Sequence, residues 1–131
     1  MDIRKTFATN KKKELEGVWV KGDGKAEFLI ARFNNPNAEK LSAELKRPHR
    51  RRIIAGTLPE DIQRDIAYTV LANAVLLDWR GVEEDEKAIA FSPEAAMKYF
   101  KEMSDFADFI AGYSVETTLF QDREEEARRG N

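Results

Sequence analysis

Cysteine is absent from the 131 residues, and long apolar runs are absent as well. Without cysteine the chain can form no disulfide, no thiolate metal site and no cysteine nucleophile. No stretch approaches the roughly 18 uninterrupted apolar residues of a membrane-spanning helix. The charged N-terminus also lacks the apolar segment of a secretion signal. These absences predict a soluble protein that is not exported and does not bind a membrane.

Histidine is nearly absent, because His49 is the only one. A single imidazole makes neither a metal site nor a catalytic triad, and no serine stands at a diagnostic spacing from it. The acidic cluster Glu83–Glu86 lacks the alternating ligands and central glycine of a calcium loop. Carboxylates are plentiful, but none pairs with a base or nucleophile in a recognisable pattern. We therefore expect no enzyme activity, no metal and no cofactor.

Charge of either sign is abundant, but it is unevenly distributed along the chain. Residues 1–57 hold 14 Lys and Arg against 7 Asp and Glu, a net charge of +7. Residues 58–131 hold 8 against 17, a net charge of −9, so that the whole chain carries −2. Such polarity can steer the basic half of one copy toward the acidic half of another, although two solvated surfaces are the alternative. The charge pattern alone does not decide between these two interpretations, and together with the family resemblance described below it leads us to expect a homo-oligomer built from head-to-tail contacts.

The length and the 42% of hydrophobic residues predict one domain. Residues 1–13 are polar and lack periodicity, so we expect a flexible basic arm there. Two strand-like runs then predict a β-hairpin at 15–33, turning at Asp23-Gly24, because glycine readily adopts the positive φ of a tight turn. The sequence GDGK lacks the spacing of a phosphate-binding loop, so the turn is preferred.

Helical patterns fill the rest of the single domain, which we place at 14–120. The helices are expected at about 38–46, 59–79 and 93–118, with the second closed by Gly81, the third capped by Ser92 and bending near Ser104. Residues 121–131 lack apolar side chains and are expected to be a disordered tail. The predicted fold class is α+β, a mainly α-helical body with an N-terminal β-hairpin.

The most basic stretch is RPHRRR, in which Pro48 should stop the preceding helix. It could contact phosphates, but no aromatic residue for base stacking lies among its arginines. We interpret it as a solvated loop or a patch that docks a protein partner. The patch residues are Arg47, Arg50, Arg51 and Arg52.

The stretch LLDWRGVEEDEKAIAFSPEAAMKYFKEMSDFADFIAGYSVETTLF, residues 76–120, resembles the signature of the tail assembly chaperones of long-tailed, siphovirus-type bacteriophages. The signature runs from a tryptophan and glycine through an acidic turn and an S-P-E helix start to a final aromatic residue. Its members here are Trp79, Gly81, Val82, Phe91, Ser92, Pro93, Glu94, Asp108, Phe109, Ile110 and Phe120. The chain departs from the pattern at Asp85-Glu86, where Asp-Gly is common.

The resemblance implies a non-catalytic chaperone made in the host cytoplasm. It would bind the tape measure protein, keep it soluble, promote assembly of the tail tube with the tube protein, and be absent from the mature virion. The alternative is a structural protein of the phage tail or of the head–tail connection, which would remain in the particle. A small nucleic-acid-binding module is a further alternative, which a salt-dependent affinity would support.

Overall fold

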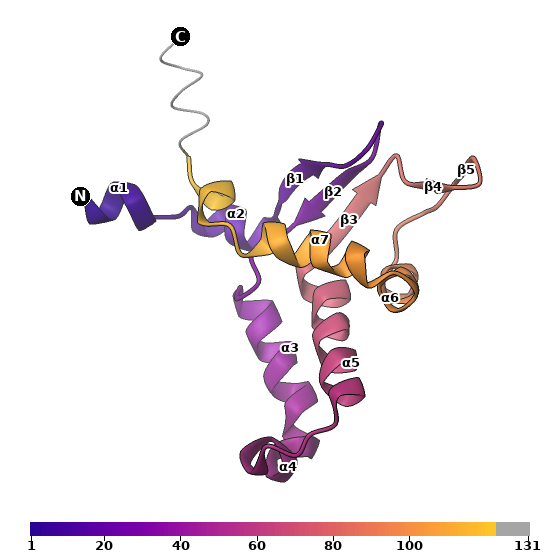
Figure 1. The fold of residues 1–131 in the computed structure, drawn as a ribbon. Coiled ribbons are helices and arrows are strands. Elements are labelled where there is room, and N and C mark those ends of the chain that lie inside the picture. Colours follow the sequence, from indigo (N-terminus) through magenta and orange to yellow (C-terminus); the bar gives the residue numbers. More distant parts are fainter. Residues whose placement is uncertain (123–131) are drawn as a thin grey trace.

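A computed structural model of the chain describes residues 1–122 and confirms the α+β class, with a helical body and an N-terminal β-hairpin (Figure 1). The elements in chain order are α1 (Ile3–Phe7), α2 (Lys11–Glu16), β1 (Val18–Lys21), β2 (Glu27–Ile30), α3 (Pro36–Lys46), η1 (Arg47–His49), α4 (Arg50–Ala55), α5 (Glu60–Val70), η2 (Leu71–Val75), β3 (Leu76–Arg80), β4 (Glu83–Glu84), β5 (Lys87–Ala88), α6 (Pro93–Glu102), α7 (Ser104–Ser114) and η3 (Thr117–Phe120). Within residues 1–122, no helix has the length and apolar character needed to cross a membrane.

The predicted hairpin is present, and a third strand extends it. Strands β1 and β2 pair antiparallel, and Gly24 in the turn between them has a φ of +59°. Strand β3 pairs antiparallel with the other side of β2, in the order β1-β2-β3. The pairing shifts between Leu29 and Ile30, so that Leu29 faces Asp78 and Ile30 faces Leu76. One face of this sheet therefore carries buried Phe28, Ile30 and Trp79 side chains.

The single helix expected at 59–79 is wrong in its second half. The α-helix ends at Val70, one π-helical turn follows, and residues 76–80 form a strand. An apolar run such as VLL has no periodicity that separates a buried helix from a buried strand. The edge of β2 supplies hydrogen-bond partners for the backbone of residues 76–80, and this pairing selects the strand. Tryptophan 79 therefore lies in the sheet and not at a helix end.

The expectation of an arm without regular structure at residues 1–13 is also corrected. Asp2 caps α1 by accepting bonds from the backbone N–H groups of Arg4 and Lys5, and Asn10 caps α2 in the same way. The Asn10 N–H donates to the Phe120 carbonyl at 2.7 Å. Side-chain caps thus stabilise two helices that are too short to show periodicity in the sequence. The backbone bond to Phe120 holds this region against the C-terminal part of the described chain.

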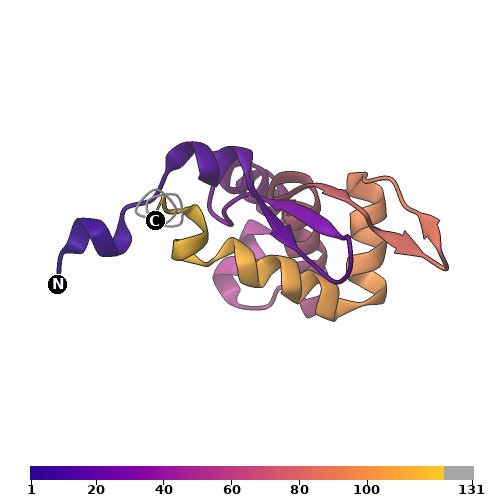
Figure 2. The same ribbon diagram turned by 90° about the horizontal axis from the view of Figure 1, so that it is seen from above.

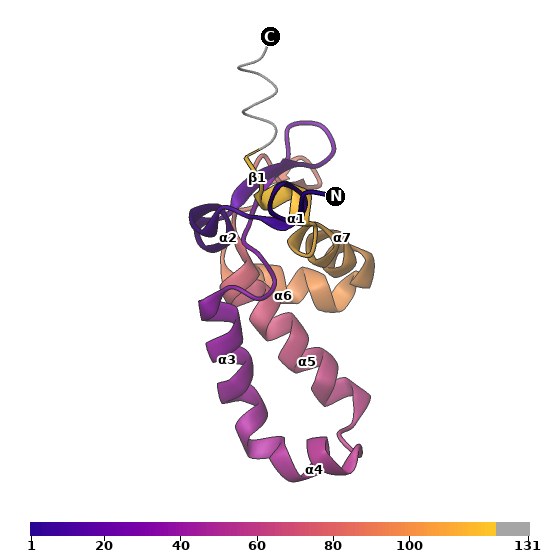
Figure 3. The same cartoon turned by 90° about the vertical axis from the view of Figure 1, so that its left-hand side faces the viewer.

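The basic stretch RPHRRR is helical, so the expectation of a solvated loop is wrong, and the other expectation, a patch that docks a partner, stays a prediction. Helix α3 begins close to the predicted residue, capped by Asn35, and ends at Lys46 as expected. Pro48 then lies in the first turn of η1, where a backbone N–H would have no partner within the helix, so the missing N–H of proline costs nothing there. Helix α4 continues from Arg50. Figures 1 and 3 show α3 and α5 descending side by side from the sheet, with α4 joining their far ends.

The region expected as one helix at 93–118 contains two α-helices and a short 3-10 turn. Ser92 caps α6 as predicted, because its hydroxyl accepts from the Ala95 N–H at 3.0 Å. The break falls at Met103, whose backbone leaves the helical conformation with φ −137° and ψ 89°, one residue before the expected bend. Of the predicted tail, Gln121 is buried, and residues 123–131 lie outside the described part of the chain.

Candidate binding groove

An apolar groove runs between α3 and α5, with η1–α4 at one end and the start of α3 and the end of α7 at the other. Its volume is about 980 Å³. The lining side chains are Phe33, Asn34, Ala38, Glu39, Ser42, Ala43, Lys46, Arg52, Ile53, Gly56, Leu58, Gln63, Ile66, Ala67, Val70, Leu71, Val75, Ala111, Ser114 and Val115. Most of these side chains are apolar or small, so the groove suits an apolar ligand surface.

The walls of the groove are built from small side chains. Ala43 on α3 and Ala67 on α5 are both exposed at its mouth, while Ile66 lies buried in its floor. Small residues allow the backbone of a third helix to approach α3 and α5 closely, because no long side chain separates the helices. The groove therefore has the character of a site for an amphipathic helix, which would complete a three-helix arrangement.

Large apolar side chains at both ends of the groove remain in contact with water. Phe33 is 47% exposed and Val115 is 54% exposed at the sheet end, and Ile53 is 39% exposed at the α4 end. Isolated exposed apolar residues are ordinary, but three around one apolar groove form a connected surface. This surface is open to a partner along the whole groove.

Asn35 fixes the upper end of α3 relative to the rest of the groove. Its side-chain oxygen accepts from the N–H groups of Asn37 and Ala38, and its amide nitrogen donates to the Ala74 carbonyl at 2.9 Å. The side chain is 1% exposed, so these bonds are shielded from water. One buried amide thus joins α3 to η2 and sets the separation of the two walls.

The predicted basic patch lies on η1 and α4, at the end of the groove away from the sheet. All four arginines are exposed, and Arg52 is the patch member that lines the groove. Lys46 lines the same end. Within residues 1–122, no ion pair involves Arg47, Arg50, Arg51 or Arg52. This end of the groove therefore presents uncompensated positive charge.

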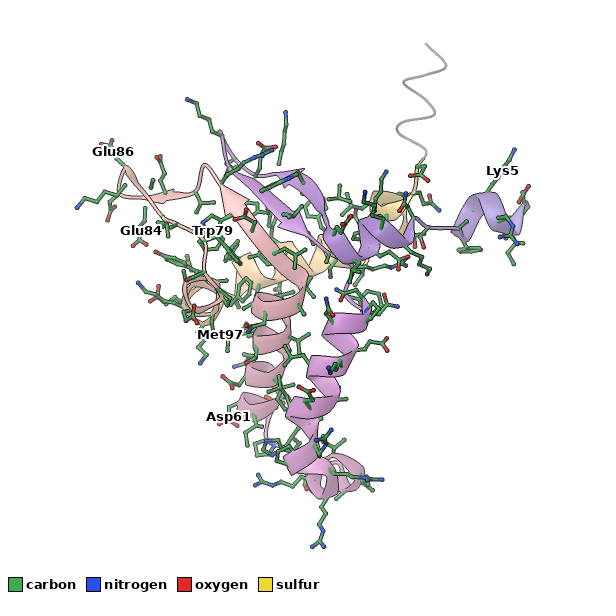
Figure 4. The ribbon with its side chains drawn as sticks, turned by 180° about the vertical axis from the view of Figure 1, so that it is seen from behind. Lys5, Asp61, Trp79, Glu84, Glu86 and Met97 are labelled. Carbon is green, nitrogen blue, oxygen red and sulfur yellow. The ribbon has the colours of Figure 1, made fainter. Side chains whose placement is uncertain are left out.

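The residues of the family signature gather elsewhere, around the indole of Trp79. This side chain is 4% exposed, and its Nε1–H donates to the Ile89 carbonyl at 2.8 Å. The Phe91 ring meets it edge-on, with centroids 5.1 Å apart, and Phe28 meets it at 6.5 Å. Figure 4 shows Trp79 on the sheet near α6. Trp79 holds the sheet against the C-terminal helices and does not reach the groove.

The other signature residues have structural positions too. Gly81 has a φ of +69°, and a Cβ there would stand 2.3 Å from the Lys25 carbonyl oxygen, so only glycine fits. Ile110 and Phe120 are fully buried, whereas Glu94 and Asp108 are exposed. The remaining members, which are partly buried, are Val82, Phe91, Ser92, Pro93 and Phe109. The signature thus marks the packing of the fold, and the groove lies beside it.

Three polar contacts outside the groove link neighbouring elements of the fold. Burial raises the pKa of the Glu14 carboxyl, but the hydrogen bond from Thr9 and the charges of Lys11 and Arg32 lower the pKa more, and the net shift is downward. The Arg80 side chain bonds Glu27 at 2.9 Å and lowers the pKa of that carboxyl. The Tyr99 hydroxyl donates to Glu84 at 2.5 Å. This bond raises the pKa of Tyr99 and fixes the β4–β5 hairpin against α6.

The groove was not predicted from the sequence, and only a weak signal for it exists there. Ala38, Ser42 and Ala43 give α3 a face of small residues, but the same pattern is typical of a closely packed core helix. Whether such a face is covered depends on the angle between α3 and α5, which no local pattern encodes. No group of three or more potential metal ligands occurs among residues 1–122.

Comparison with known proteins gives one family. The model of a family described as YdaY prophage protein matches residues 33–131, which includes α3, α4, α5 and hence most of the groove. Neither the search of curated proteins nor the search of solved structures gives a significant match.

Proposed function

The chain belongs to the YdaY prophage protein family and is therefore of bacteriophage origin, and from this premise we propose that it is a non-catalytic tail assembly chaperone. In this role it binds the tape measure protein in the host cytoplasm, keeps that protein soluble and promotes assembly of the tail tube. The observation that carries the proposal is the open apolar groove between α3 and α5. A tape measure chaperone must cover long amphipathic helices, and a groove of this kind accepts one helix.

The proposal is tested by co-expressing the chain with the tape measure protein of the same prophage, followed by a pull-down. We expect the chain to capture the tape measure protein and to raise its soluble fraction. Ala43→Glu should abolish capture, because it places a charge in the apolar wall at an exposed position where the fold tolerates it. The matched control is Lys40→Gln on the same helix, which changes the net charge by the same amount outside the groove.

One result would contradict the proposed site, and another would contradict the function. Capture that survives Ala43→Glu would remove the groove from the interaction. Recovery of the chain in purified phage particles would favour the structural alternative, because a chaperone leaves the assembly once the tail tube has formed. Mass spectrometry of purified particles measures the second outcome directly.

A further inference from the structure

The α4 end of the groove differs chemically from the other end. Lys46 and Arg52 line it, and the exposed Arg47, Arg50 and Arg51 adjoin it. The sheet end instead carries Glu39, together with exposed Phe33 and Val115. A helix lying in the groove would therefore meet positive charge at one of its ends and apolar surface with a carboxylate at the other.

Within residues 1–122, no ion pair neutralises the positive charge of the arginines at α4. The nearest acidic residues in sequence are Glu44 before the arginines and Glu60 and Asp61 after them, and within residues 1–122 none of the three forms an ion pair with an arginine of the patch. The first turn of α4 also contains no acidic residue, and no side chain caps it. Arg52 and its neighbours thus have no acidic counterpart at ion-pair distance among the described residues, and an acidic partner would supply one.

We infer that the groove selects amphipathic helices that carry acidic side chains at the end lying over α4. This inference rests on the proposed function and specifies the class of helix that the chaperone accepts. The apolar stripe of the guest fills the groove, and its carboxylates pair with Arg52 and the neighbouring arginines. Bidentate contacts of this kind add orientation as well as affinity.

A second copy of the chain is a poorer occupant. Helix α1 exposes the apolar side chains of Ile3 and Phe7, which could lie in the groove of another copy. It carries Arg4 and Lys5, however, and these would face the arginines of α4. Like charges at close range oppose binding, so the charge of the groove favours an acidic helix from another protein.

The probe is a pair of fluorescent amphipathic peptides of about 14 residues, three to four helical turns, with the same apolar stripe. One carries three glutamates at one end, and its twin carries lysines there. By fluorescence anisotropy against the full chain, the acidic peptide should bind about tenfold more tightly at low salt, and the difference should shrink as salt screens the charges. Arg52→Gln should lower the affinity for the acidic peptide severalfold and should not lower the affinity for its lysine twin. Lys25→Gln, an equal loss of charge in the hairpin turn, should change neither affinity.

The outcomes separate this inference from the proposed function. Equal binding of the two peptides, lost in Ala43→Glu, would overturn the charge preference and leave the groove as the client site. Failure of both peptides to bind would count against the groove itself, and so against both proposals. A single-stranded oligonucleotide that displaces the acidic peptide at lower concentration than the unlabelled peptide would overturn the inference in favour of nucleic acid. Loss of peptide affinity as the concentration of the chain rises would identify a second copy as the occupant.

Discussion

Trp79 is the residue at which the three-stranded sheet and the C-terminal helices meet. Its ring lies within 6.5 Å of those of Phe28, Phe91, Tyr99 and Phe106, measured between centroids. These residues come from β2, the segment before α6, and α6 and α7. One side chain therefore connects parts of the chain that are distant in sequence, and its removal affects all of them.

We expect Trp79→Ala to lower the free energy of unfolding by about 3–5 kcal/mol, because it leaves a large cavity and an unpaired Ile89 carbonyl. Trp79→Phe should lose much less, since it keeps an aromatic ring among the neighbours and gives up the indole bond. Urea unfolding followed by circular dichroism measures both. An unchanged unfolding midpoint in Trp79→Ala would contradict the buried position.

The turn between β4 and β5 is a second feature that single residues decide. Asp85 and Glu86 have φ values of 50° and 66°, the left-handed conformation that side chains disfavour. A two-residue hairpin turn with both residues at positive φ prefers glycine at its second position. Figure 4 shows Glu86 at the far tip of this hairpin. The departure from Asp-Gly at this point therefore stores local strain.

Glu86→Gly should raise the free energy of unfolding by about 0.5–1 kcal/mol, because the relief of strain exceeds the extra flexibility of glycine in the unfolded chain. Glu86→Gln keeps the Cβ and removes the charge, so it should stay within about 0.5 kcal/mol of the wild type. Chemical unfolding compares the two variants. Equal stabilisation by both would mean that the charge of Glu86 and not its backbone conformation is responsible.

At the scale of elements, α2 and η3 hold the two ends of the described chain together. Lys13 donates to the Gln121 carbonyl at 3.1 Å, and the Gln121 side chain donates to the Thr6 carbonyl at 2.9 Å. The Glu14 carboxylate bonds Thr9 and pairs with Arg32 at 3.2 Å. Arg32 in turn lies over the Phe120 ring. The buried Glu14 charge is thus the centre of this junction.

Because the pKa of Glu14 is lower in the folded chain than in the unfolded chain, its ionisation stabilises the fold at neutral pH. That contribution is complete above the unfolded pKa of roughly 4.3 and is lost as the pH falls through the folded pKa. We expect the unfolding midpoint of the wild type to fall between about pH 5 and pH 3. Glu14→Gln should flatten part of this fall, whereas Glu16→Gln on the exposed side of α2 should retain it. Identical pH profiles for wild type and Glu14→Gln would contradict the role of Glu14.

At the scale of the whole molecule, the basic and acidic halves of the sequence are not fully separated in space among residues 1–122. The α3–α5 hairpin places Asp61 at the lower end of α5, the end that α4 joins (Figure 4). The feature that stands apart is α1, which projects from the body in Figures 1 and 2. Its Ile3 and Phe7 are 73% and 59% exposed and lie four residues apart on one face. Helix α1 therefore offers an apolar contact for another copy.

We expect the chain to self-associate, with both a charged and an apolar contribution. Light scattering over a concentration and salt series should show a mass above that of the monomer at low salt, which falls as salt rises, because exposed charges are screened over about 8 Å at physiological salt. Phe7→Ser should reduce the part that persists at high salt. Ile54→Ser, which removes an exposed apolar side chain from α4, should leave it unchanged. A monomer at every concentration would contradict the prediction.

The sequence by itself determined the features that local chemistry decides. Asp23-Gly24 fixed the β1–β2 turn because the backbone there requires positive φ at the glycine. Ser92 and Pro93 fixed the start of α6, since a hydroxyl caps free N–H groups and proline needs none. The family signature likewise lies in one continuous segment, so its residues could be named without coordinates, although their packing around Trp79 could not.

Only the tertiary structure decided whether the apolar run up to Trp79 is helix or strand, and whether α3 and α5 leave a groove between them. The run satisfies both periodicities, and the edge of β2 selects the strand by supplying backbone partners from a distant part of the chain. The groove depends on the separation of two helices that Asn35 and η1–α4 fix at opposite ends. Such long-range contacts have no local signature in the sequence, because the same residues would suit a packed helix–helix interface as well as an open groove.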